Sequence, residues 1–202
     1  MLRVEQLCCA RGPRELFRDL SFAAGAGELV LVTGPNGSGK TTLLRALAGL
    51  TRPESGTISW SGALCSLAAS RAYVGHLAGW KDTLTVTENL QLSWQLDAEA
   101  AAHDDGAATA ALAHAGLARQ RNLAVARLSQ GQKKRLHLAR LSRSTRRLWL
   151  LDEPAAALDD QGLGVLTDLV AAHLKGGGLA AIATHQPLTI AALRTHCVAL
   201  TG

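Results

Sequence analysis

The chain has 202 residues, 48% of them hydrophobic and 18% charged, and its formal net charge is +5. This length suits one well-buried domain, and this composition excludes a disordered chain. No apolar run approaches the roughly 18 residues that cross a bilayer, and the N-terminus lacks the pattern of a signal peptide, so we expect a cytoplasmic protein that reaches a membrane only through a partner or by lying on its surface.

The charge pattern and the cysteines argue against a nucleic-acid groove and a cysteine metal site. The densest basic run, "QKKRLHLARLSRSTRR", has a helical pattern without the interleaved aromatic residues that stack on bases. It favours a solvated helix face or attraction to anionic lipid, and we expect no nucleic-acid partner. The four cysteines, Cys8, Cys9, Cys65 and Cys197, form no CxxC pair, and we expect buried thiols.

The N-terminal part of the chain predicts a small sheet, a core strand and a helix. Residues 2–8 and 15–23 have the pattern of short strands separated by the turn "RGPR". "ELVLVTG" is a continuous apolar strand of the kind that a parallel sheet buries on both faces, and "TISW" is a further strand. Between them a helix begins inside "GSGKTTLLRALAGL", with Gly49 as its C-cap. Its apolar face would carry Leu43, Leu44, Leu47 and Leu50.

From about residue 82 to 145 the pattern is helical. Thr85 and Glu88 have the spacing of a capping box, and Val86, Leu90 and Trp94 follow at intervals of four. The alanine-rich stretch that follows predicts two helices with a joint near residues 104–106. A last helix is expected from about Gln130 to Ser144.

Alternating strands and helices return in the C-terminal part of the chain. The expected order is strand "LWLLDE", a helix near 160–174, strand "LAAIAT", a helix near 187–195 and strand "CVAL". The fold class is therefore α/β, with a parallel-sheet core, an N-terminal antiparallel β subdomain and a helical insert at about 82–145.

A glycine-rich loop carries the clearest chemical signal. "GPNGSGKT" fits G-x-x-x-x-G-K-[ST] between a strand and a helix, which is the context of a P-loop. Glycines let backbone N–H groups enclose phosphate oxygens, and the helix N-terminus adds the positive end of its dipole. Lys40 is expected to reach the β- and γ-phosphates, and the Thr41 hydroxyl to ligate Mg²⁺. The predicted nucleotide-binding residues are Gly34, Pro35, Asn36, Gly37, Ser38, Gly39, Lys40, Thr41 and Thr42.

The apolar strand "LWLLDEP" supplies two carboxylates. Asp152 and Glu153 would emerge at the C-terminal edge of a parallel sheet, where ligands bind. We expect Asp152 to hold Mg²⁺, through water, and Glu153 to act on the attacking water. An apolar run ending in "DE" is weak evidence alone and strong evidence when it is paired with a P-loop.

The segment "LSQGQKKR" resembles the signature of the ABC-type ATPases, which is commonly LSGGQ. Ser129 can cap the following helix and Gly131 allows close backbone approach, so this helix end can hold a γ-phosphate. Gln130 stands where the first glycine of the family usually stands. The signature residues are Leu128, Ser129, Gln130, Gly131 and Gln132.

The resemblance continues in the family's order through a D-loop and a switch histidine. "AALD" places Asp159 in the D-loop, and "ATHQ" places His185 at the switch-histidine position, where the family implies a catalytic role beside Glu153. The chain is thereby expected to be a single ABC-type ATP-binding domain over residues 1–202 that hydrolyses ATP with Mg²⁺.

Two positions depart from the family. Arg11 stands where an aromatic ring usually stacks on adenine; a guanidinium can stack on a base too, and a solvated turn residue is the alternative. His76 stands at the Q-loop position. Histidine is a poor ligand for a hard cation, so water-mediated contact or pure coupling is expected there.

The resemblance also implies partners. In ABC ATPases the signature of one subunit completes the P-loop site of another, which implies a homodimer or paired ATP-binding subunits arranged head to tail. Integral membrane subunits would dock on the helical insert. Trp80 and Trp94 are candidates for that contact, or they fill the core of the insert.

Across essentially the whole chain, segments such as "YVGHLAGWKDTLTVTENL" and "THQPL" resemble the ATP-binding subunits of bacterial cytochrome c maturation. This implies peripheral attachment to the cytoplasmic face of the inner membrane, partners of the CcmB and CcmC kind, and ATP hydrolysis tied to release of the haem-loaded chaperone CcmE. Direct haem binding is not evident. The alternatives are another small-substrate or lipoprotein exporter, a soluble ABC ATPase acting on ribosomes or DNA, and a P-loop kinase of a small metabolite.

Overall fold

The computed structural model describes residues 1–61, 71–75, 79–96 and 105–201. The chain forms two compact units. The first unit comprises Met1–Gly75, Arg146–Pro154 and Val170–Gly202, and the second comprises His76–Thr145 and Ala155–Leu169. Among the helices in the described ranges, none has the length and apolar composition needed to cross a membrane.

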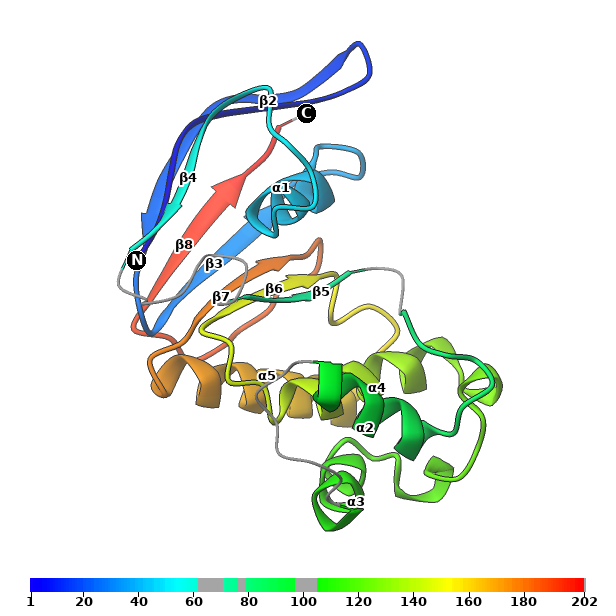
Figure 1. Ribbon diagram of the computed structural model, residues 1–202. Helices are drawn as coiled ribbons and strands as arrows, with labels where there is room; N and C mark the ends of the chain where they lie inside the picture. The colour runs from blue at the N-terminus through cyan, green and yellow to red at the C-terminus, as the bar shows by residue number, and fades with distance from the viewer. Residues whose placement is uncertain (62–70, 76–78, 97–104, 202) are drawn as a thin grey trace. The chain divides into compact units, whose positions relative to one another are not determined.

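A three-stranded antiparallel sheet opens the first unit (Figure 1). Its strands are β1 (Leu2–Arg11), β2 (Arg14–Ala24) and β4 (Ser55–Trp60), in the order β2-β1-β4. β1 and β2 form the expected hairpin, although β1 runs on to Arg11 because its residues pair with β2 up to the turn itself. The hairpin thereby carries Arg11 at its tip.

The second sheet of this unit is parallel, and the carboxyl ends of its strands carry the candidate site residues. It contains β5 (Arg71–Val74), β6 (Leu148–Asp152), β7 (Leu179–Ala183), β3 (Glu28–Thr33) and β8 (Arg194–Ala199), in that order across the sheet. Every residue of β6 and β7 is buried, as the continuous apolar runs predict. The carboxyl ends of β3, β6 and β7 lead into the P-loop, Glu153 and His185, so these motifs meet at one sheet edge.

Helix α1 (Lys40–Leu47) packs an apolar face into the core of the first unit. Leu43, Leu44 and Leu47 are fully buried, but Leu50 is 56% exposed, so its placement on this face was wrong. Gly49 has φ +63°, its N–H donates to Ala46 O at 2.9 Å, and the Leu50 N–H donates to Arg45 O at 2.8 Å. This is the bonding pattern of a Schellman motif. The C-cap itself is Ala48, and Gly49 is the left-handed residue that follows it, so a glycine ends the helix one position later in the motif than predicted and turns Leu50 away from the helix face.

The helix expected near 187–195 is absent from the structure. Residues 187–193 lie outside helices and strands, and β8 begins at Arg194, earlier than expected. The Leu193 N–H donates to Gly27 O at 3.0 Å, and the β8 ladder beside β3 continues from there. Because the Leu193 N–H bonds to another segment, the end of this stretch continues into the sheet instead of a helical ladder. Pairing with the sheet therefore overrides a helical pattern of apolar residues.

The second unit is helical. It contains α2 (Val86–Leu96), α3 (Asp105–His114), the short 3₁₀ helices η1 (Ala118–Gln120) and η2 (Val125–Arg127), α4 (Gln130–Leu141) and the first part of α5 (Asp160–Lys175). The expected helix N-terminal to α3, with part of its joint, lies outside the described residues. α4 ends at Leu141 rather than Ser144, and α5 matches its predicted range closely.

A capping box begins α2 as predicted. The Thr85 N–H donates to Glu88 Oε2 at 2.7 Å, and the Glu88 N–H donates to Thr85 Oγ1 at 3.2 Å. The helix then turns Val86, Leu90 and Trp94 into the core of the second unit. These reciprocal bonds satisfy two backbone N–H groups that have no partner within the helix, and they fix the residue at which the apolar face starts.

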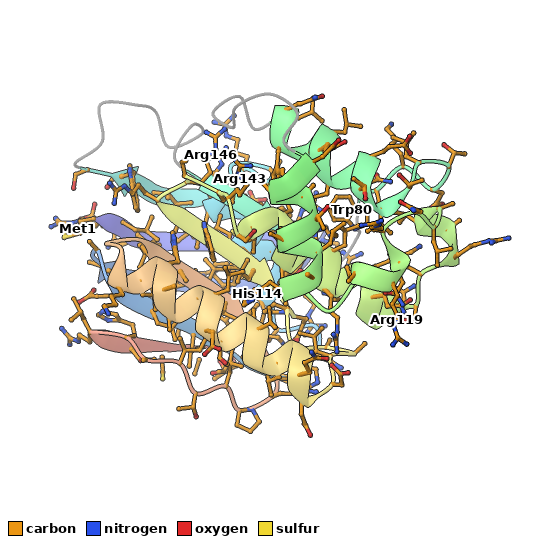
Figure 2. The ribbon with its side chains drawn as sticks, turned by 90° about the horizontal axis from the view of Figure 1, so that it is seen from below. Met1, Trp80, His114, Arg119, Arg143 and Arg146 are labelled. Atoms are coloured by element: carbon orange, nitrogen blue, oxygen red, sulfur yellow. The ribbon has the colours of Figure 1, made fainter. Side chains whose placement is uncertain are left out.

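Both tryptophans of the second unit contribute to its core. Trp94 is 5% exposed, and its Nε1 donates to Arg140 O at 3.1 Å. Trp80, labelled in Figure 2, packs against the same cluster, and its ring centroid lies 4.6 Å from that of His137. Burial lowers the pKa of His137 to about 3, so this ring is neutral at physiological pH. The structure therefore favours core filling over a docking contact for Trp94.

The cysteines behave less uniformly than expected. Cys9 is buried, and its burial raises the pKa of its thiol to about 11. Cys8 is half-buried and Cys197 on β8 is exposed, while Cys65 lies outside the described residues. Edge strand β8 alternates its side chains between the core and solvent, which places Cys197 outside the core.

Glu28 provides a pH-dependent tie between β3 and β8. Its Oε2 accepts the Gly25 N–H at 2.7 Å and lies 2.9 Å from His196 Nε2, and the Gly25 bond is the main cause of a pKa below its ordinary value of 4.5. A carboxylate with a lowered folded pKa stabilises the fold above its unfolded pKa and loses that contribution as pH falls through the folded value.

We therefore expect Glu28→Gln to have a lower melting temperature than the parent near about pH 6, and the same melting temperature as the parent near about pH 3. Thermal melts of both proteins, with Glu54→Gln as an exposed control, check this; a deficit that is constant with pH would contradict it.

Candidate nucleotide site

The P-loop lies between β3 and α1. Gly34 has φ +143°, and a Cβ there would collide with the Leu200 carbonyl oxygen at the end of β8. Ser38 is 1% exposed, and its hydroxyl has no hydrogen-bond partner among the described residues. A backbone cradle that excludes side chains and aims a buried hydroxyl inward fits a phosphate group.

Lys40 is the first residue of α1 and is only 7% exposed. Its Nζ donates to Gly34 O at 2.8 Å and to Pro35 O at 3.0 Å. The ammonium group thus sits inside the loop, held by two neutral carbonyl oxygens. Phosphate oxygens carry full negative charge, so they bind this cation more strongly than the carbonyls do.

Thr41 and Asp152, which the sequence predicts as metal ligands, are hydrogen-bonded to each other. The Thr41 Oγ1 donates to Asp152 Oδ1 at 3.1 Å across a sequence separation of 111, and Asp152 is 1% exposed. A hydroxyl and a buried carboxylate that face each other beside a phosphate cradle are oxygen ligands of the type that Mg²⁺ prefers. The donor set fits Mg²⁺.

Glu153 and His185 meet at the same sheet edge. His185 Nδ1 lies 2.9 Å from Glu153 Oε2. The Glu153 side chain is 18% exposed and that of His185 is 52% exposed. Glu153 has φ +49°, an uncommon conformation for a residue with a Cβ, and its N–H donates to Ala183 O at 2.9 Å. The backbone is therefore held in a strained turn that sets where the carboxylate lies.

A cavity of about 600 Å³ lies beside the P-loop and Glu153. Lys40, Thr41 and Glu153 line it together with Arg11 from the tip of the β1–β2 hairpin. This places Arg11 within the nucleotide cavity, where the family's adenine-stacking residue is expected. The cavity is lined by Ala10, Arg11, Leu16, Asn36, Gly37, Gly39, Lys40, Thr41, Thr42, Arg45, Thr51 and Glu153.

Sequence reasoning missed four lining residues, Ala10, Leu16, Arg45 and Thr51. Arg45 lies one helical turn after Thr41, so helical spacing was a usable signal for it. Its Nε donates to Thr51 Oγ1 at 3.3 Å. Leu16 comes from β2 and is 7% exposed; only the folded hairpin brings it to the loop.

The signature residues form a separate site in the second unit. Ser129 is the N-cap of α4, with its Oγ accepting the Gln132 N–H at 3.2 Å and Gln132 Oε1 accepting the Ser129 N–H at 2.9 Å. A cavity of about 330 Å³ is lined by Ser129, Gly131 and Gln132 and by the D-loop residue Asp159. Leu128 is buried and Gln130 is exposed. His76 lies outside the described residues.

A P-loop after a buried strand, a hydroxyl–carboxylate pair and a glutamate after β6 define a P-loop nucleotide-hydrolase domain. A family model described as "ABC transporter" matches residues 17–156, and the chain belongs to this family. It is an ATP-hydrolysing domain of the ABC type.

Relatives match the chain over its whole length. "Cytochrome c biogenesis ATP-binding export protein CcmA 1" of Salmonella paratyphi A is 46% identical over 208 residues, which cover 100% of this chain and 98% of the relative. The protein named CcmA of Shigella flexneri is 42% identical, covering 100% and 97%. A solved dimeric ATP-binding cassette in a post-hydrolysis state bound to ADP and Pi has a TM-score of 0.79 at 23% identity, covering 92% of this chain and 88% of that one. The last comparison shows the fold.

Proposed function

We propose that the chain is the ATP-hydrolysing subunit of a membrane ABC complex that serves cytochrome c biogenesis. The assignment to cytochrome c biogenesis depends on one observation: the chain is 46% identical over its full length to a protein named as a cytochrome c biogenesis ATP-binding export protein. The geometry supports the chemical part independently, because Lys40, Thr41, Asp152, Glu153 and His185 gather at one sheet edge beside one cavity.

ATP binds in the P-loop cavity in this proposal. Lys40 exchanges its two carbonyl acceptors for the β- and γ-phosphates, and Ser38 gains the acceptor that it lacks among the described residues. Thr41 and Asp152 would hold Mg²⁺. When bound, Mg²⁺ neutralises charge on the phosphate oxygens.

Glu153 orients the attacking water and accepts its proton. Its carboxylate is held by the strained backbone at φ +49° and by His185 at 2.9 Å, so it needs little reorganisation before reaction. His185 is the more exposed partner, and in this proposal its other ring nitrogen meets the γ-phosphate. The pair thus acts on both the nucleophile and the phosphoryl group.

The signature site completes the nucleotide site of a second copy. Ser129 and the N-terminus of α4 form an anion-binding helix end, which suits the γ-phosphate of ATP held by a partner chain. Two chains arranged head to tail would then close two equivalent sites, with Asp159 of the D-loop at the same junction. The dimeric description of a cassette with this fold supports the pairing.

Membrane subunits of the CcmB and CcmC kind are the proposed partners, with the chain held peripherally at the cytoplasmic face of the inner membrane. Hydrolysis would drive release of haem-loaded CcmE. Affinity purification from solubilised membranes of a strain carrying the tagged chain tests this: membrane proteins of these two kinds are expected to co-purify. Recovery of the membrane subunits of a lipoprotein exporter instead would overturn the assignment to cytochrome c biogenesis.

Arg11 is expected to bind the base of ATP. It lines the nucleotide cavity from the hairpin tip, and a guanidinium plane stacks on an aromatic base. We expect Arg11→Ala to weaken ATP binding about 5-fold or more while changing tripolyphosphate binding less than about 2-fold. Titration calorimetry with both ligands measures this. Arg14→Ala, at the other end of the same turn, is the matched control; an equal loss for both ligands would assign Arg11 a charge effect instead of stacking.

A further inference from the structure

Arg135 is a buried cation on the helix that begins with the signature. It lies on α4 and is 9% exposed, although it carries a permanent charge. A buried charge is tolerated only when it is paired and hydrogen-bonded. The groups that satisfy Arg135 therefore show what this residue holds together.

Its guanidinium reaches three segments of the second unit. Nη2 forms an ion pair with Asp159 Oδ1, and Nη1 donates to Gln161 Oε1 at 3.3 Å and to Ala115 O at 3.4 Å. Gly116 leaves the room for this head group, because a Cβ there would collide with Nη1. The signature helix, the D-loop, the start of α5 and the end of α3 thus share one cation.

Asp159 pairs with the buried Arg135 and is also exposed to solvent. Its side chain is 65% exposed, whereas that of Arg135 is 11% exposed, so the ion pair has a fixed inner end and a solvent-facing outer end. Asp159 Oδ1 also accepts the Gly162 N–H at 2.9 Å in the first turn of α5. The Arg135 guanidinium is the main cause that holds the pKa of Asp159 below its ordinary value. The aspartate is therefore presented as an oriented anion on the wall of the signature cavity.

A second contact joins the signature backbone to the D-loop backbone. A Cβ on Gly131 would lie 2.5 Å from the Ala157 carbonyl oxygen, so the two main chains touch there. Ala157 has φ +63°, which is an unfavourable conformation for a residue with a Cβ. Such a conformation persists only where neighbouring contacts over-determine it. Arg135 and the Gly131–Ala157 contact supply those constraints from α4.

We propose that Arg135 is a positioning residue for ATP hydrolysis, which fixes the signature segment Ser129–Gln132 and the D-loop segment Ala157–Asp159 as one rigid surface against the nucleotide of a second copy. The proposal rests on the paired arrangement proposed above. Lysine at this position keeps the charge but loses the forked geometry, so it cannot bond Asp159, Gln161 and Ala115 together. The P-loop site belongs to the first unit, so we expect the change at Arg135 to leave ATP binding by a single copy intact.

The test compares Arg135→Lys with Arg119→Lys, a matched change at an exposed arginine of the same unit, labelled in Figure 2. We expect Arg135→Lys to lower kcat about 10- to 100-fold with ATP affinity of the monomer within about 2-fold of the parent, and Arg119→Lys to change neither. Fluorescent ATP binding and phosphate release on the purified full chain give both values. A kcat equal to that of the parent, or a loss of ATP affinity that matches the loss of kcat, overturns the positioning role.

A second readout separates this proposal from the paired arrangement itself. In a Glu153→Gln background, sedimentation with ATP is expected to show dimers that Arg135→Lys abolishes and Arg119→Lys preserves. Absence of dimers in the Glu153→Gln parent would overturn the pairing on which the role depends. Equal dimerisation of all three proteins would overturn the role of Arg135 alone. Asp159→Asn is a second variant for the case in which Arg135→Lys fails to fold. It retains an acceptor for the Gly162 N–H but loses the charge that pairs with Arg135, so we expect the same loss of kcat. Full activity of Asp159→Asn would count against the proposal.

Discussion

Glu153→Gln is expected to lower kcat for ATP hydrolysis about 10²- to 10⁴-fold, the range that a positioned general base contributes. Glutamine has nearly the shape of glutamate and can still accept from His185, so the turn at φ +49° and the P-loop cavity are preserved. It has no lone pair basic enough to take a proton from water. ATP affinity is therefore expected to stay within about 3-fold of the parent, because the loss falls on the chemical step alone.

Phosphate release and ATP binding on the same preparations check this expectation. Glu54→Gln is the control, since Glu54 is exposed and lies in the first unit away from the cavity lining. Turnover of Glu153→Gln near that of the parent would remove Glu153 from the reaction. Loss of ATP binding in this variant would instead show that the glutamate holds the nucleotide.

The chemistry-bearing motifs were predictable because each is a short, local pattern. The P-loop spacing sets its own backbone conformation, and the buried runs of β6 and β7 require a parallel sheet whose ends converge. Convergence at one edge then brings Thr41 within 3.1 Å of Asp152 and Glu153 within 2.9 Å of His185. These pairs can be predicted although their members lie far apart in the sequence, because the topology of the parallel sheet brings the ends of the strands together.

Features that depend on competition between segments were not predictable. The apolar residues of 187–193 have a helical pattern, but the Leu193 N–H bonds to Gly27 at the sheet. Leu50 is a local case: its N–H donates to Arg45 O at the end of the same helix, and the glycine end at Gly49, which the sequence predicted, already excludes Leu50 from the apolar face. Side-chain periodicity alone does not record where main-chain bonds end an element.

Arg135 escaped the sequence reasoning for a related reason. In "QKKRLHLARL" it is one of several basic residues, and the helical pattern alone assigns them all to a solvated face. Only the folded unit shows that Lys133 forms an ion pair with the exposed Asp82 while Arg135 turns inward to Asp159. Which residue of a charged run is buried depends on where Gly116 leaves space, and that position lies on another segment.

Lys40→Ala is expected to weaken ATP binding about 100-fold or more, because it removes charge-assisted hydrogen bonds to two phosphate groups. The fold should tolerate the change better than the function does. Among the described residues, Lys40 Nζ donates to the carbonyl oxygens of Gly34 and Pro35, and water can solvate these carbonyls once the side chain is removed. ATP titration with thermal melts of the same samples measures both effects, and Lys175→Ala, in the last turn of α5, is the control for loss of a positive charge. ATP affinity close to that of the parent would show that the ammonium stays with the loop carbonyls when nucleotide binds, and the backbone cradle around Gly34 and Ser38 would then account for phosphate binding without it.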